Sequence, residues 1–392
     1  MSEAICVAAL SARLMAESAR RGGFDVVAFD LFGDLDTRRA ARHWTCIGSP
    51  GALAIDAQSM ARALVALRAV PGLVGWVAGS GFERCPELLA SAGDSLPLLG
   101  NAAATVRAVR EPATFFAGLA ACGIPHPEIV FALPLAPAGW LSKDARGSGG
   151  AHIRVACTGD AEPPDASVSR YYQRVHAGVS MSVLFLADGR DARICGVSEL
   201  IVEAHDERPY VFHGAVGPAP LPPRARAGVR DIVAALVSQW RLVGLNSVDF
   251  LLDGERIAVL EVNPRPSASM ALYDDVAPRG LMRAHVEACR GAALASVTAT
   301  ARREKRVRGQ SIVFANATTT FSRRIVSWMV EQGFVHDIPM PGTVSERGAP
   351  LCTVSAWGSS IASARTQLAT RAAQVLQTLS AAQHSREPET SV

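Results

Sequence analysis

Hydrophobic runs alternate with helical patterns through the first hundred residues of the chain. The runs predict strands, and the segments between them predict helices. The predicted strands are residues 4–10, 24–29, 46–47 and 72–78, and the predicted helices are residues 11–20 and 59–69. Strand, helix and strand at this spacing are typical of a parallel sheet with crossover helices. We therefore expect a Rossmann-like domain over residues 1–108.

Polar residues follow these predicted strands at their carboxyl ends, where parallel sheets bind their ligands. Ser11 follows the first strand, Asp34 and Asp36 follow the second, and Glu83 comes after a Gly-Ser-Gly turn that ends the last. We expect all four to face a ligand cleft, where carboxylates would attract an amine substrate. Asp34 and Asp36 have a second interpretation, because acidic residues favour the first turn of a helix and both would then only cap it.

The rest of the chain has shorter strand patterns, interrupted by glycine, and two longer helices. The predicted strands are residues 140–143, 151–155, 171–175, 183–186, 193–202, 247–252 and 256–262, and the helices are 111–122 and 224–243. We assign residues 109–298 to a central α+β domain, 299–382 to a small C-terminal α+β module, and 383–392 to a disordered tail. Residues 159–167 predict an exposed loop. The basic stretch 299–309 predicts a solvated linker or, alternatively, a phosphate contact.

Composition narrows the classes of partner. The 392 residues are 49% hydrophobic and 19% charged, with a net charge of +3, so we expect a folded chain without a strong field for polyanions. No apolar run reaches the length of about 18 residues that a membrane span needs, and the first residues lack a signal-peptide pattern. Eight scattered cysteines without zinc spacing favour a reducing cytoplasm. We expect a cytoplasmic protein that acts on small molecules, without nucleic-acid or membrane partners, and a homodimer is a possible assembly.

The first candidate motif joins a lysine to a glycine-rich loop. Lys143 is one of only two lysines in the chain, and it ends a predicted strand shortly before Gly147, Ser148, Gly149 and Gly150. Glycines let backbone N–H groups turn toward a phosphate chain, and lysine adds a mobile cation. No Gly-Lys-Ser/Thr sequence closes the loop, so it is not a Walker loop. A plain glycine-rich hairpin is the other interpretation.

The second candidate motif is a predicted antiparallel hairpin that carries oxygen ligands. Asp249 lies on its first strand, Glu261 and Asn263 lie on its second, and Asp253-Gly254 marks the turn. Side chains alternate along a strand, so Glu261 and Asn263 share a face, and Asp249 can converge with them. Two carboxylates and an amide oxygen form a hard site that is suited to Mg²⁺. A polar hairpin end without a metal is the alternative.

Together the two motifs resemble the ATP-grasp superfamily, in which ATP lies between two α+β subdomains. The resemblance implies ATP and Mg²⁺, with Mn²⁺ as a possible substitute, and makes Asp249, Glu261 and Asn263 the metal ligands. It also implies catalytic roles for Lys143, at the phosphates, and for Arg265, which faces an acyl phosphate. The residues that it places around the nucleotide are Lys143, Gly147, Ser148, Gly149, Gly150, Gln173, Arg174, Val175, His176 and Arg110.

Three of the matched positions depart from the pattern of the superfamily. Residues 173–176 match the hinge whose backbone contacts adenine, yet Arg174 stands where an acidic residue is frequent. Ala177 stands where a ribose-binding glutamate often lies, which leaves the ribose contacts open. Arg110 stands where a second phosphate lysine is common, and arginine supplies the same charge with a different geometry.

A narrower resemblance is to ATP-grasp proteins described as predicted carboligases related to biotin carboxylase. Some of them are associated with one-carbon cofactors of the methanofuran and methanopterin type. The resemblance implies an ATP-dependent carboxylate–amine ligase that forms an acyl phosphate and then an amide. Such an enzyme would join glutamate to tyrosine or tyramine, for example, or extend a pterin side chain. Two alternatives stay open, namely phosphoryl transfer to a non-carboxylate small molecule and a nucleotide-binding regulatory protein without turnover.

Overall fold

The computed structural model of the chain describes residues 2–91, 93, 96–159, 170–297 and 306–384. Three predictions extend beyond these ranges. Residues 160–167 of the predicted loop, 299–305 of the basic stretch and 385–392 of the predicted tail lie outside the described residues. Within the described ranges, no helix is long and apolar enough to cross a membrane.

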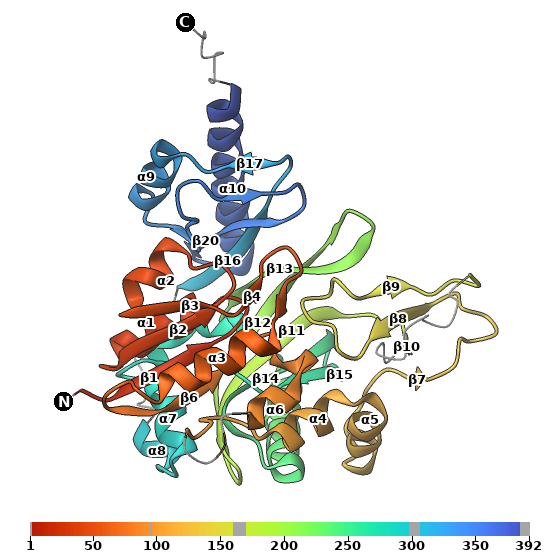
Figure 1. Cartoon of the computed structure of the whole chain (residues 1–392). Helices are drawn as coiled ribbons and strands as arrows, with labels where there is room; N and C mark the ends of the chain where they lie inside the picture. Colours follow the sequence, from red (N-terminus) through yellow and green to blue (C-terminus); the bar gives the residue numbers. More distant parts are fainter. Residues whose placement is uncertain (1, 92, 94–95, 160–169, 298–305, 385–392) are drawn as a thin grey trace, which may run out of the picture.

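A four-stranded parallel sheet forms the N-terminal part of the molecule (Figure 1). Its strands lie in the order β3 (His43–Cys46), β2 (Asp25–Asp30), β1 (Ala4–Ala8) and β6 (Leu73–Ala78), with helices α1 (Arg13–Arg21), α2 (Leu35–Ala40) and α3 (Ala57–Leu67). Ile5 and Val7 pack in one hydrophobic cluster and Cys6 in another, because both faces of the sheet are covered. This explains the continuous apolar runs and confirms the predicted parallel sheet. The third strand begins earlier than expected, at His43, where it pairs with Val27.

A smaller sheet carries the lysine and leads into the glycine loop. Its strands lie in the order β7 (Ile129–Val130), β10 (Arg170–Arg174), β8 (Trp140–Asp144) and β9 (Arg154–Val155), and helices α4 (Ala103–Arg110) and α5 (Pro112–Ala121) precede them. The predicted strand at 151–155 is wrong for its first three residues. Gly149 and Gly150 have φ values of 65° and 76°, and the chain continues as a turn through His152 before it pairs.

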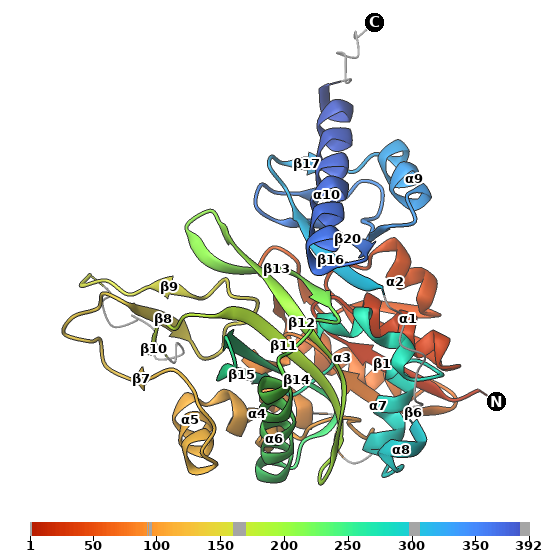
Figure 2. The same ribbon diagram turned by 180° about the vertical axis from the view of Figure 1, so that it is seen from behind.

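A long antiparallel sheet lies between the parallel sheet and the smaller sheet (Figures 1 and 2). Its order is β15 (Arg256–Asn263), β14 (Val243–Asp253), β11 (Val179–Asp188), β12 (Ala192–His205), β13 (Arg208–Gly217), β16 (Val307–Phe314), β20 (Pro350–Gly358) and β18 (Val335–His336). Helix α6 (Pro223–Trp240) packs Val233 and Val237 into one cluster with Phe185 and Phe250 of the sheet. The apolar patterns predicted only the inner parts of β11 and β12, since the ladders extend into polar ends.

The C-terminal segment extends this same sheet, because β16 pairs with both β13 and β20. Helices α9 (Arg323–Glu331) and α10 (Ile361–His384) pack on it around Phe321 and Val354. The remaining elements are β4 (Gly48–Ser49), β5 (Ala54–Ile55), β17 (Thr319–Thr320), β19 (Val344–Ser345), α7 (Leu281–Cys289), α8 (Leu294–Val297), η1 (Phe82–Arg84), η2 (Pro86–Ala90), η3 (Ala268–Leu272) and η4 (Asp274–Val276). The mixed α/β and α+β class is thus confirmed, while the exact domain boundaries stay predictions.

Candidate active site

Lys143 lies near the end of β8 and keeps only 6% of its surface exposed. Its Nζ donates to Oε1 of Gln173, on the neighbouring strand β10, at 3.0 Å, and lies 5.8 Å from the centroid of the Tyr171 ring. The hydrogen-bond partner is a neutral amide. The charge of Lys143 also acts on the Glu261 carboxylate, and a phosphate would be a further anion that this buried ammonium group can bind.

The glycine loop is held between β8 and β13. Its first turn is closed by a hydrogen bond from the Gly147 N–H to the Asp144 carbonyl at 3.0 Å, and the Phe212 N–H donates to the Gly149 carbonyl at 2.9 Å. A Cβ on Gly150 would lie 1.6 Å from the Tyr210 carbonyl oxygen, so only glycine fits there. Ser148, between these glycines, is half-buried.

Arg110, at the end of α4, joins the glycine loop to a candidate metal ligand. Its Nη1 donates to Oε2 of Glu261 at 2.8 Å. Its Nη2 donates to the carbonyl of Gly147 at 2.6 Å and to that of Ala145 at 3.1 Å. One guanidinium therefore bridges a carboxylate on β15 and the loop after β8. The structure brings together Lys143, the loop and the hairpin, which lie far apart in the sequence.

The three candidate metal ligands converge at the end of the β14–β15 hairpin. Asp249 and Glu261 are register partners across the two strands, and Nδ2 of Asn263 donates to Oδ2 of Asp249 at 3.0 Å. Among the described residues, no group of three or more His, Cys, Asp and Glu side chains is placed to hold a metal ion, so the third ligand would be the Asn263 amide. This amide presents its nitrogen to Asp249, and its oxygen would have to turn to reach a shared cation.

The two carboxylates have opposite electrostatic surroundings. Burial and the charge of neighbouring Glu261 raise the pKa of Asp249 above its ordinary value. Burial opposes the ionisation of Glu261, but the charges of Arg110 and then Lys143 outweigh it and lower the pKa of Glu261. Two carboxylates on adjacent strands resist ionising together, and a divalent cation between them would remove that conflict.

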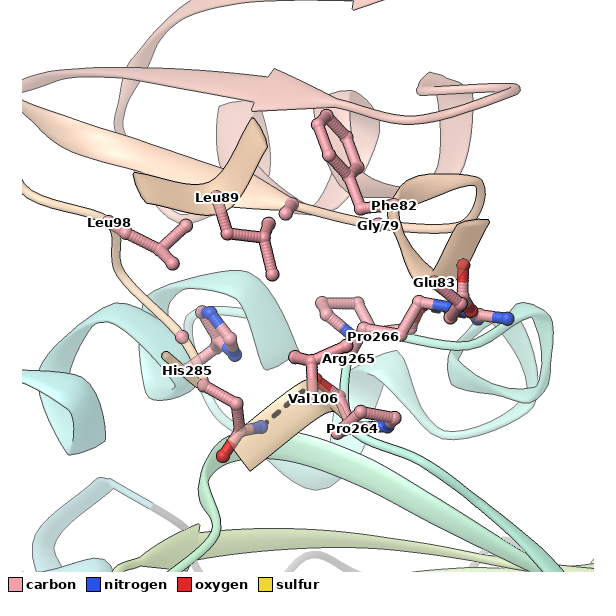
Figure 3. A pocket seen from close by; sticks show the side chains of 13 residues that line it. Gly79, Phe82, Glu83, Leu89, Leu98, Val106, Pro264, Arg265, Pro266 and His285 are labelled. Atoms are coloured by element: carbon pink, nitrogen blue, oxygen red, sulfur yellow. Dashed lines mark hydrogen bonds and ion pairs between the residues drawn. The ribbon is translucent and has the colours of Figure 1, made fainter. Parts of the chain in front are cut away.

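Arg265 is not a free cation, because Glu83 pairs with it. The Arg265 Nε donates to the Glu83 carboxylate, which also accepts the Gly81 N–H at 2.8 Å. Figure 3 shows this pair at one end of a small cavity, with His285 at the other end. The Arg265 Nη2 reaches Oδ1 of Asn263 at 3.3 Å. A chain of polar contacts therefore runs from the N-terminal sheet through Arg265 to the candidate metal ligands.

The other predicted substrate residues lie against the C-terminal segment. The Ser11 hydroxyl donates to Asp337 at 3.3 Å, and Asp36 accepts the Asp337 N–H at 2.7 Å. Arg13 forms an ion pair with Asp337 at 2.7 Å, so the charge of the Asp337 carboxylate is balanced by this arginine. Asp34 is buried at the N-cap position just before α2, but its side chain makes no capping hydrogen bond. Asp36 lies in the first turn of α2, as its second interpretation expects, and its carboxylate accepts the N–H groups of Asp337 and Ile338. Whether Asp36 also faces a substrate stays a prediction.

The predicted adenine hinge lies at the end of β10. The N–H of Arg174 donates to the Glu128 carbonyl and that of Val175 to the Gly139 carbonyl, each at 2.9 Å. The Arg174 guanidinium lies 4.7 Å from the Trp140 ring centroid, which accounts for a basic residue at this position. His176 is exposed, with Nδ1 at 2.8 Å from the Ala177 carbonyl.

Buried polar atoms without partners test whether a nucleotide fits this site. Within the described residues, Nε of Arg110, Nε2 of Gln173 and Nδ1 of His152 have no hydrogen-bond partner. Arg110 and His152 line one cavity together with Glu261. Buried donors are rarely left unpaired, and phosphate oxygens are acceptors that would satisfy them. The site therefore fits a phosphate-bearing ligand. No pattern around His152, which lies two residues after the loop, indicates a binding role.

Comparison of the sequence with protein families and known proteins identifies similarity in the part of the chain that carries the candidate site. Residues 117–269 match the model of the ATP-grasp domain family, and this span contains both motifs. The carbamoyl phosphate synthase large chain of Thermoplasma volcanium is 29% identical over 106 residues, which is 26% of this chain and 10% of that protein. The matched part is therefore a small fraction of that relative.

Solved structures share the fold over nearly the whole chain. Pyruvate carboxylase from Rhizobium etli superposes with a TM-score of 0.72 at 16% identity, covering 95% of this chain and 37% of that one. An L-amino acid ligase from Bacillus licheniformis superposes with a TM-score of 0.69 at 13% identity, covering 94% and 96%. Nearly the whole chain thus shares the fold of these solved structures, and residues 117–269 match the ATP-grasp domain family.

Proposed function

We propose that the protein is an ATP- and Mg²⁺-dependent ligase that joins a carboxylic acid to an amine. The observation that carries the proposal is the meeting of Lys143, Arg110 and Glu261 beside buried donors that lack partners. The ATP-grasp match over residues 117–269 supports a nucleotide as the ligand. The likeness to an L-amino acid ligase supports amide formation, although at 13% identity it shows only the fold.

Asp249, Glu261 and Asn263 would hold the metal ion. Bound there, Mg²⁺ would neutralise charge on the phosphates and favour in-line transfer. The donor set fits, because Mg²⁺ prefers oxygen ligands from carboxylates and amides. Arg110 already balances Glu261, so the ion would share this carboxylate with the guanidinium or displace it.

The remaining steps follow from the residues that surround the phosphates. Lys143 and Arg110 would stabilise the negative charge that spreads as the γ-phosphoryl group leaves ATP. The acid's carboxylate oxygen attacks that phosphorus, giving an acyl phosphate and ADP. The amine nitrogen then attacks the acyl carbon, phosphate leaves, and the nitrogen loses a proton. The loop at 147–150 would keep water from the acyl phosphate.

Arg265 is the candidate contact for the acid. It lies beside Asn263 and is held in place by Glu83, so its remaining N–H donors have a defined direction. Arginine binds carboxylates through two parallel hydrogen bonds, and lysine cannot reproduce that geometry. We propose that Arg265→Lys raises the KM of the acid more than that of the amine.

The substrate class is proposed from the resemblance to one-carbon cofactor ligases. An activity assay with ATP and Mg²⁺ should therefore use a panel of substrates that contains glutamate with tyrosine or tyramine, and carboxylated or amino-bearing pterins. ADP release should require the acid, and mass spectrometry should detect a product equal to acid plus amine minus water. Hydroxylamine should trap the acyl phosphate of a correct acid as a hydroxamate, even when the natural amine is missing from the panel.

Two outcomes of this assay would contradict the proposal and favour another function. A stable phosphorylated product without amide or hydroxamate would indicate a phosphotransferase. Nucleotide binding without ADP release from any acid would favour a regulatory protein. Glu261→Gln is the matched control, because it removes one charge from the metal site while keeping the size of the side chain.

A further inference from the structure

His152 follows the glycine loop and folds back onto its first residue. A Cβ built on Gly147 would lie 2.0 Å from Cγ and 2.4 Å from Nδ1 of His152. The imidazole ring therefore occupies the space that the missing side chain of Gly147 leaves free. The requirement for glycine at this position comes from the histidine, in addition to any need for backbone freedom.

The Nδ1 atom of His152 is buried and has no hydrogen-bond partner within the described part of the chain. The side chain lines a cavity together with Arg110, Glu261 and Tyr171. An unsatisfied buried polar atom costs free energy, and native structures rarely keep one without a ligand or a water that completes it.

The charges near the ring indicate which ligand would complete it. Lys143 and Arg110 act on His152 as cations, and Glu261 acts as an anion. Burial is the main cause that lowers the pKa of His152 to about 4, so the ring is neutral at neutral pH. A neutral imidazole that carries its proton on Nδ1 can donate to an anion without adding a third buried positive charge.

We propose that His152 is a phosphate-binding residue, whose Nδ1–H donates to a non-bridging oxygen of the β- or γ-phosphoryl group of the nucleotide. The terminal phosphates are the expected partners, because the same cavity is lined by Arg110 and by the metal-ligand candidate Glu261. The inference rests on the proposed nucleotide site. A contact between His152 and the β- or γ-phosphoryl group would favour ATP and ADP over AMP, because AMP lacks these phosphates.

Isothermal titration of ATP, ADP and AMP in the presence of Mg²⁺ tests this role. His152→Ala should weaken ATP and ADP about tenfold or more, a typical loss for a hydrogen bond to a charged group, and leave AMP unchanged. His152→Asn should recover most of the affinity, because its amide nitrogen can take the place of Nδ1. His152→Gln places its amide nitrogen near the position of Nε2 and should recover little.

A matched control separates binding from packing. His43 is exposed on β3, and His43→Gln should bind all three nucleotides like the natural protein. In protein labelled with ¹⁵N-histidine, saturating ATP should shift the Nδ1 resonance that disappears in His152→Gln. A purely structural ring would lower the melting temperature of His152→Ala without changing the ratio of ATP to AMP affinity.

The outcomes can be told apart from failure of the proposed function. If the natural protein binds nucleotide and every His152 variant binds ATP equally well, the role of His152 is overturned and the nucleotide site stands. An Nδ1 resonance that does not move at saturating ATP overturns it as well. If the natural protein binds no nucleotide, the proposed function fails, and the role of His152 fails with it.

Discussion

Arg110 and Glu261, which lie 151 positions apart in the chain, are joined by a hydrogen bond of 2.8 Å. The same guanidinium holds the carbonyls of Ala145 and Gly147. A positive group therefore lies between the glycine loop and a candidate metal ligand. A bound cation would compete with Arg110 for Glu261, and phosphates would compete with Glu261 for Arg110.

Replacing Arg110 tests this competition. Arg110→Met should destabilise the protein by about 1–3 kcal/mol, less than for a fully buried pair because Glu261 is partly exposed. Without nucleotide, Mg²⁺ alone should raise the melting temperature of Arg110→Met more than that of the natural protein, because the ion can then balance Glu261. Equal Mg²⁺ responses in thermal melts of the two proteins would place the ion away from Glu261.

Two neighbouring glycines provide a matched pair of substitutions. Gly150→Ala forces a Cβ to 1.6 Å from the Tyr210 carbonyl, whereas a Cβ on Gly149 meets nothing within 4 Å. Both residues have positive φ, so each alanine carries a backbone strain of about 1–2 kcal/mol. Urea unfolding should show the larger loss for Gly150→Ala, and proteolysis of the loop should be faster in that variant. Equal losses would mean that the loop does not rest on β13.

The burial of the Asp36 carboxylate, which disfavours its charged form, predicts a pH dependence of stability. Burial is the main cause that raises the pKa of Asp36 from 3.8 to about 6. A raised folded-state pKa means that the stability contributed by Asp36 is fully present below pH 3.8 and is lost as the pH rises through about 6.

Asp36→Asn is the variant that isolates this contribution. Its amide oxygen can still accept a hydrogen bond from the Asp337 N–H, but it carries no charge at any pH. The stability of the natural protein relative to Asp36→Asn should fall between pH 4 and pH 7, by about 1.4 kcal/mol for each unit of the pKa shift. Denaturant unfolding at several pH values measures the difference. A difference that is constant, or that grows with pH, would contradict the buried charge.

The local sequence pattern predicted those parts of the site that lie within a single strand or within the β14–β15 hairpin. Glu261 and Asn263 share a face because strand side chains alternate, and the short turn after Asp253 brings Asp249 opposite Glu261. The parallel sheet was also predictable, because β1 is apolar throughout and β2 is apolar between Asp25 and Asp30. The turn at residues 151–153 was missed, since a short alternation of apolar and polar residues does not distinguish a strand from a turn.

Contacts between distant segments could not be predicted in this way. Nothing in the sequence around Arg110 indicates that its side chain reaches Glu261, because that contact depends on how α4 packs against β15. Asp36 was assigned to a cleft or a cap, yet its partner is a backbone turn near residue 337. The pairing of Arg265 with Glu83 could not be predicted either, because it joins the segment after β15 to η1, which are far apart in the sequence.

The most direct test of the whole account is calorimetric titration of ATP into the natural protein and into Glu261→Gln, with Mg²⁺ and with EDTA. The account predicts Mg²⁺-dependent binding that raises the melting temperature, with a stabilisation of about 2.7 kcal/mol when free ATP exceeds its Kd a hundredfold. Glu261→Gln should keep its fold and lose the Mg²⁺ dependence. No binding by the natural protein at millimolar Mg²⁺ and ATP, or an unchanged Mg²⁺ dependence in Glu261→Gln, would contradict the nucleotide and metal site.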